Sequence, residues 1–186
     1  RLVGELWPGT VLSESVFHLR VWYQQDGGSS AEVRARVQAA KKAWSRLGSF
    51  WTTSGIPRRQ RRTTWVTLVR SSLVSALHTR VLMPAQMHEL EAVQMRHLRA
   101  LCTGEARGKT NVQVRKPLGV PTIMSYLRCM RVRMLQRWAS HPGLGKLMLA
   151  ALAGDSDIQE GPQLDRRHRP TKHANPWLRT LWGDLE

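Results

Sequence analysis

Apolar residues recur every three or four positions in four segments of this chain, and proline or glycine separates each segment from the next. This spacing places the apolar residues along one side of an α-helix, as a stripe that has to be buried. In the first segment, residues 30–47, the stripe consists of Val33, Val37, Ala40, Trp44 and Leu47. The pattern predicts a mainly α-helical fold in which a bundle of about four helices packs through these stripes.

The other three helices are indicated in the same way. Pro57, Pro84 and Pro121 stand where the first turn of a helix tolerates proline. The three stripes are Trp65, Leu68, Val69, Ser72, Leu73 and Ala76; Met87, Leu90, Gln94, Leu98 and Leu101; and Ile123, Tyr126, Leu127, Met130, Met134 and Trp138. Between the last two helices, we expect the segment TNVQVRKPLGVP to form a short turn.

The two ends of the chain have a different character. Residues 16–25 alternate between the two sides of an extended chain and are followed by Asp-Gly-Gly, which predicts a short β-hairpin or ribbon. After residue 143, the segment LGKLMLAALAG predicts one short helix, and the polar, proline-containing residues beyond it predict a linker or flexible C-terminal tail. An amphipathic pattern returns at PWLRTLWGDLE, the last eleven residues.

Positive charge is the second constraint. The chain has 29 Lys and Arg against 13 Asp and Glu, a net charge of +16. Because such an excess repels itself within a folded domain, a polyanionic partner is the first hypothesis. An anionic membrane surface and a decayed reading frame with arbitrary charge are the alternatives. No apolar run reaches the roughly 20 residues that span a bilayer.

Four arginines crowd the first turns of the second helix, in the sequence RRQRR at residues 58–62. Cations at a helix N-terminus oppose the helix dipole, so local helix stability does not explain them, and an external anion is the simplest compensation. The candidate nucleic-acid contacts are, in order, Arg58, Arg59, Arg61 and Arg62; Arg34, Lys41 and Lys42; and Arg128 and Arg131.

Motifs of the common enzyme classes are absent from the sequence, which has no phosphate-binding P-loop, nucleophile elbow, zinc-protease motif or calcium loop. Asp155 and Asp157 form the one close Asp pair and lack a third ligand. Cys102 and Cys129 are too few for a disulfide framework or a zinc site, and we expect both to be buried free thiols. We therefore expect no catalytic residue, metal or cofactor in this segment.

The order of these features resembles a known family. A ribbon FHLRVWYQQDGG is followed by helices AEVRARVQAAKKAWSRL, IPRRQRRTTWVTLVRSSLVSAL and LEAVQMRHLRALC, a connector VRKPLGVP and a helix ending RMLQRWASH. Over residues 16–141 this order resembles the region after the catalytic palm in non-LTR (LINE-type) retrotransposon reverse transcriptases. In that family the ribbon grips the primer end and the helices form the thumb. Arg20 stands at a position where the family has glycine.

The resemblance implies a division into the end of the palm (1–28), a helical thumb-like domain (29–141), and a short helix with a polar linker or tail (142–186). The primer-grip-like residues would be Phe17, His18, Leu19 and Arg20. The catalytic aspartates and their Mg would belong to the palm of the parent polymerase, N-terminal to Arg1. The implied partners are an RNA template, an RNA/DNA hybrid and the rest of the polymerase chain, inside the cell and in the nucleus.

A thumb of this kind holds a duplex by its backbone phosphates without reading bases. Arginine suits this task because its planar guanidinium contacts phosphate oxygens in pairs. Two other functions fit the same residues: a free-standing, basic, helical RNA-binding module, and a retroelement relic with no role.

Overall fold

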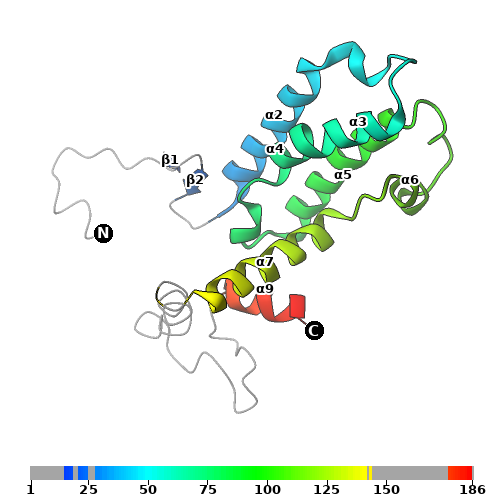
Figure 1. Cartoon of the computed structure of the whole chain (residues 1–186). Coiled ribbons are helices and arrows are strands. Elements are labelled where there is room, and N and C mark those ends of the chain that lie inside the picture. Colours follow the sequence, from blue (N-terminus) through cyan, green and yellow to red (C-terminus); the bar gives the residue numbers. More distant parts are fainter. Residues whose placement is uncertain (1–14, 19–20, 25–27, 142, 144–175, 186) are drawn as a thin grey trace, which may run out of the picture.

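The computed structural model describes residues 15–18, 21–24, 28–141, 143 and 176–185 (Figure 1). The described part is mainly helical, as the stripes predict. Its longer helices are α2 (Ser30–Arg46), α5 (Pro84–Leu101) and α7 (Ile123–Ser140), and a fourth runs from Arg58 to Val74. Short 3₁₀ turns, η1 (Gly48–Trp51) and η3 (Leu77–Thr79), follow α2 and the fourth helix.

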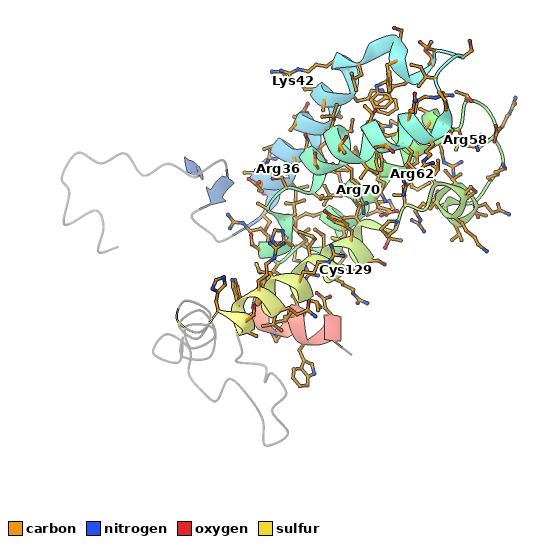
Figure 2. All side chains as sticks on the ribbon, in the orientation of Figure 1. Arg36, Lys42, Arg58, Arg62, Arg70 and Cys129 are labelled. Atoms are coloured by element: carbon orange, nitrogen blue, oxygen red, sulfur yellow. The ribbon has the colours of Figure 1, made fainter. Side chains whose placement is uncertain are left out.

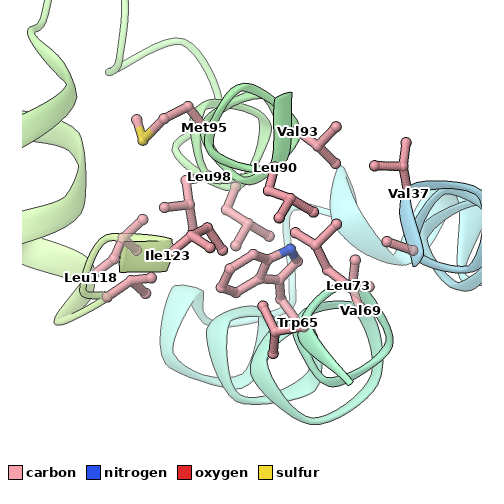
Figure 3. Close-up of a cluster of buried hydrophobic side chains, with 14 of the residues drawn as sticks. Val37, Trp65, Val69, Leu73, Leu90, Val93, Met95, Leu98, Leu118 and Ile123 are labelled. Carbon is pink, nitrogen blue, oxygen red and sulfur yellow. The ribbon is translucent and has the colours of Figure 1, made fainter. Parts of the chain in front are cut away.

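The core lies where α2, the Arg58–Val74 helix and α5 pack together. In Figure 3 the indole of Trp65 lies between its own helix and Leu90 and Leu98 of α5, and the side chains around it are apolar. Trp65, Leu90 and Leu98 are each fully buried. Val37 closes the core from the side of α2. The predicted stripes of α2 and α5 are therefore the surfaces that face the core.

The Arg58–Val74 helix departs from a regular α-helix in its middle. It consists of α3 (Arg58–Thr64), a π-helical segment η2 (Trp65–Arg70) and α4 (Ser71–Val74). A π-turn spans more residues than an α-turn, so the stripe shifts along the sequence. Leu68, predicted to be in the core, is 48% exposed, and Arg70 takes an inward position at 6% exposed.

The expected turn between α5 and α7 is instead a helix, α6 (Asn111–Leu118). Thr110 and Gln113 cap it reciprocally: the Thr110 hydroxyl accepts from the Gln113 amide at 3.3 Å, and the Gln113 side chain accepts from the Thr110 amide at 2.9 Å. Pro117 costs one backbone hydrogen bond only one residue before the helix ends. Gly119 then ends α6 with a φ of +56°, which favours glycine.

The last part of the chain, predicted to belong to a flexible tail, contains a helix. Helix α9 (Pro176–Leu185) packs along α7, with Trp177 and Leu181 buried (Figure 1). Residues 144–175, which include the short helix and linker predicted after α7, lie outside the described residues.

Two strands precede α2. Strands β1 (Ser15–His18) and β2 (Val21–Gln24) pair antiparallel, with Phe17 opposite Trp22. Of the primer-grip-like residues, Phe17 and His18 belong to β1, and Leu19 and Arg20 lie outside the described residues. Their contact with a primer stays a prediction.

The two cysteines differ in burial. Cys102 is buried at the end of α5, as expected, but Cys129 is exposed, which corrects the second half of that prediction. Cys129 lies on the side of α7 away from Ile123 and Leu127, which face the core. Since α7 is covered along only part of its circumference, the thiol remains at the surface.

Candidate nucleic-acid interface

The start of α3 and the end of α6 border a basic surface groove of about 440 Å³. It is lined by Arg58, Arg59, Arg62, Lys116, Pro117, Leu118 and Gly119, and we call it the α3–α6 groove. Figure 2 shows Arg58 and Arg62 on the side of α3 that is turned toward α6. Four of the seven lining residues are cations and none is acidic, so the groove suits an anionic ligand.

Two of the groove's cations are held by the protein itself. Arg58 donates from Nη2 to the carboxylate of Glu105, in the loop between α5 and α6. Arg62 donates from Nε to the Leu118 carbonyl and from Nη2 to the Gly119 carbonyl, the latter at 3.3 Å. A cation at these carbonyls matches the negative end of the α6 dipole. Arg62 therefore joins α3 to α6.

The other two cations are available to a ligand. Arg59 and Lys116 are exposed, and neither has a hydrogen-bond or ion-pair partner in the part of the chain that the structure describes. Lys116 was not among the residues predicted from the sequence, because its segment was expected to be a turn. The Thr110-x-x-Gln113 capping pattern is the signal that could have placed it on a helix.

Arg61, predicted to belong to the same cluster, is turned the other way. It is 8% exposed and donates from Nη1 to the Trp51 carbonyl at 2.9 Å and from Nε to the Ile56 carbonyl at 3.2 Å. It precedes the core residue Trp65 by four positions and so shares its side of the helix. The structure therefore assigns Arg61 to the packing of η1 against α3, and not to a ligand surface.

The loop between α5 and α6 adds two exposed cations, Arg107 and Lys109. Arg99 shapes this loop: its guanidinium donates to the carbonyls of Ala106 and Lys109, at 3.0 and 2.9 Å, and to Oδ1 of Asn111 at 3.0 Å. The loop is tied to α3 by the Arg58–Glu105 ion pair. The positive surface thus continues from the α3–α6 groove onto a loop that the protein holds in place.

Arg34 and Lys41 line a second groove, of about 620 Å³, between α2 and α5. It also contains Glu89, so its charge is mixed. Lys42 is exposed but lines neither groove. Of the three cations predicted on α2, Arg34 and Lys41 therefore share a groove, and Lys42 does not line it.

The two arginines predicted on α7 are engaged by α9. Asp184 forms ion pairs with both: its Oδ1 lies 3.1 Å from Nε of Arg128, and its Oδ2 accepts a hydrogen bond from Nε of Arg131. The side chain of Arg131 is 4% exposed and that of Arg128 is 51% exposed. Arg131 is therefore not accessible to a ligand while α9 is docked, which corrects its place among the surface contacts.

Arg70 is a buried cation that the sequence pattern did not reveal. Its guanidinium carbon lies 4.0 Å from the ring centroid of Tyr126, and its Nε and Nη2 have no hydrogen-bond partner among the described residues. Burial lowers the pKa of Arg70, and repulsion from Arg62 adds to this, against the opposing effects of Tyr126 and Glu91. Arginine is not deprotonated in proteins, so Arg70 stays charged and adds positive potential close to Arg62.

Comparisons with protein-family models, with curated proteins and with solved structures find no match to this chain. In the described residues, no group of three or more His, Cys, Asp or Glu side chains could hold a metal ion. Nor is any described helix long and apolar enough to cross a membrane. The site is therefore characterised by its geometry and charge alone.

Proposed function

We propose that residues 29–141 hold the phosphate backbone of an RNA/DNA hybrid, as the thumb-like part of an RNA-directed DNA polymerase from a retroelement. The observation that carries this proposal is the α3–α6 groove, in which two helices present four cations and no acid. A groove of this kind supplies charge and shape without a base-reading surface, which suits a duplex held by its backbone.

Each cation of the groove has a distinct part in this function. Arg58 and Arg62 are oriented by bonds to the protein, which lowers the entropy lost when they meet a phosphate. Arg59 and Lys116 keep all their donors for the ligand. The guanidinium of Arg59 can contact two phosphate oxygens at once, whereas the ammonium of Lys116 acts as a point charge.

The resemblance to non-LTR reverse transcriptases supports the polymerase context. In such a parent enzyme, this segment would bind and the palm would carry the paired aspartates with their Mg. The ribbon containing Phe17, His18, Leu19 and Arg20 would lie at the primer end, and the enzyme would act in the nucleus. A free-standing RNA-binding module would use the same groove, but it would bind duplex RNA or single strands at least as tightly as the hybrid.

The experiment that tests this function measures the affinity of the chain for an RNA/DNA hybrid as a function of salt, by fluorescence anisotropy. With about four phosphates neutralised, log affinity should fall against log salt with a slope near −4. Replacing Arg59 and Lys116 together by Ala should reduce the magnitude of the slope by about 2. The matched control removes two exposed arginines away from both grooves, Arg46→Ala with Arg96→Ala.

A salt-independent affinity would contradict the proposal, as would an equal loss in the control. Duplex RNA and single-stranded RNA of the same length, measured in parallel, decide between the thumb-like function and the RNA-binding module. Tighter binding of the hybrid favours the thumb-like function.

A further inference from the structure

Helix α7 carries four arginines, Arg128, Arg131, Arg133 and Arg137, and no acidic residue. The acid that meets two of these arginines comes from another helix, because Asp184 of α9 pairs with both Arg128 and Arg131. Figure 1 shows α9 lying beside α7. One carboxylate shared by two guanidiniums leaves a net positive charge at this contact, so the site still attracts anions while α9 is docked.

Helix α9 also contacts the rest of the chain through two buried apolar side chains. Trp177 and Leu181 are 8% and 4% exposed, and the indole of Trp177 lies 5.9 Å from that of Trp138 on α7, at an angle of 40° between the rings. The indole N–H of Trp177 donates to the His78 carbonyl at 3.3 Å. With Asp184, these anchors fall at intervals of four and three residues, the spacing by which an amphipathic helix binds a groove.

A ten-residue helix is not stable by itself in water, so α9 is ordered because it is docked. Its only charged anchor among the described residues, Asp184, binds the guanidiniums in the way that a phosphate oxygen pair would. A ligand that carries many phosphates can therefore compete with Asp184 for the same donors. Losing that carboxylate removes the ion pairs that join α9 to α7.

We propose that α9 is an autoinhibitory helix. Docked on α7, it covers Arg131 and pairs Arg128 with Asp184. Displaced, it leaves both guanidiniums to a nucleic-acid backbone, as a second phosphate-binding surface apart from the α3–α6 groove. In naming nucleic acid as the ligand, this inference rests on the proposed function.

The test uses the full chain and an RNA/DNA hybrid. Asp184→Asn keeps the size of the side chain and removes its charge, which leaves Arg131 buried without an ionised partner and releases α9. The variant should bind the hybrid about tenfold more tightly, with a salt slope steeper by about 2, one for each arginine released from Asp184. Arg128→Ala and Arg131→Ala, added to that variant, should cancel the gain. Asp157→Asn is the charge-matched control and should leave the affinity within about twofold, as expected for a single charge screened at moderate salt.

Hydrogen exchange of the unaltered chain gives a second measurement that needs no substitution. Backbone amides of residues 176–185 should lose protection when the hybrid is added, and those of α5 should not. Unchanged protection in α9, or an unchanged affinity in Asp184→Asn, overturns the inference.

The outcomes separate the two proposals. If Arg59→Ala with Lys116→Ala weakens binding but Asp184→Asn has no effect, the inference fails and the proposed function stands. If those groove substitutions have no effect and Asp184→Asn binds through Arg128 and Arg131, the proposed use of the groove fails and the inference stands. If no form of the chain binds the hybrid, both are overturned.

Discussion

The guanidinium of Arg70 stacks on the ring of Tyr126, 4.0 Å from its centroid, and so joins the π-helical segment η2 to α7. Since Nε and Nη2 of Arg70 find no hydrogen-bond acceptor among the described residues, the ring supplies a direct favourable contact for this buried charge. The stability of the charge thus depends on an aromatic side chain from a helix more than 50 positions along the chain.

Replacing Tyr126 by Leu should therefore lower the free energy of unfolding by about 2 kcal/mol, the size of a desolvated cation–π contact. Tyr126→Phe keeps the ring and should cost less than half as much. Urea denaturation measures both. Equal losses in the two variants would show that the ring's faces do not hold Arg70.

Arg61 and Arg59 should respond to Ala substitution in opposite ways. Arg61→Ala removes the donor that the buried Trp51 carbonyl accepts from, so the free energy of unfolding should fall by about 2 kcal/mol. Hybrid affinity, measured where the variant is still folded, should stay within about threefold of the parent. Arg59→Ala should leave stability within about 0.5 kcal/mol and weaken binding. Weaker binding by a fully folded Arg61→Ala protein would show that Arg61 contacts the ligand.

Stability should also depend on pH through His97. Its ring is buried and stacks on Trp44, with centroids 4.4 Å apart and planes 6° from parallel. Burial, with a smaller contribution from Arg96, lowers the pKa of His97 to about 4, whereas an unfolded histidine has a pKa near 6.5. Between these values the unfolded chain binds a proton that the folded chain does not. The free energy of unfolding should therefore fall as the pH falls from about 6.5 to about 4, by on the order of 3 kcal/mol.

The control for this prediction is His97→Phe, which keeps a flat ring against Trp44 and cannot titrate. Its unfolding free energy should depend less steeply on pH in the same window. Some slope should remain, because burial and the charge of Arg131 lower the pKa of His78 as well. An undiminished slope in His97→Phe would exclude His97 as its source.

Glu105 occupies Arg58 at the edge of the α3–α6 groove, and both side chains are partly exposed. Glu105→Gln should therefore remove the carboxylate that competes with a phosphate for Arg58, and raise hybrid affinity about threefold to tenfold. Stability should change by less than about 1 kcal/mol, as for other surface ion pairs. The control is Glu160→Gln, which changes the net charge by the same amount. Fluorescence anisotropy titrations compare the hybrid affinities of the two variants. Equal affinities in the two variants would count against a phosphate contact at Arg58.

The helices that bury an apolar stripe were predictable from the sequence. Val33, Val37 and Ala40 of α2 and Leu90, Leu98 and Leu101 of α5 lie in the core as their spacing indicates. The stripe failed at Leu68 and Arg70, because it assumes the same rotation for every residue and a π-turn changes that rotation. The local sequence WVTLVR contains no pattern that indicates such a turn.

The candidate site was predictable in part. The RRQRR segment does present Arg58, Arg59 and Arg62 to one groove, and extending the Trp65 stripe back by four residues would have assigned Arg61 to the interior. Lys116 could have been placed on a helix from the capping pattern at Thr110 and Gln113. Asp184 could not have been predicted, because its pairing with Arg131 joins residues 53 positions apart. No local pattern records a contact at such a separation.

The two hydrogen bonds that Arg62 donates to the carbonyls of Leu118 and Gly119, at the end of α6, have a consequence for experiments on the groove. Because this side chain fixes the distance between α3 and α6, its removal would change the width of the groove together with its charge. Arg62→Ala would then also weaken the binding of ligands that never touch residue 62, and Arg62→Lys, which keeps the charge but loses the forked geometry, would behave more like Ala than like Arg. Residue 62 thus acts as the spacer of the binding surface, and its neighbours Arg59 and Lys116 report the strength of individual phosphate contacts.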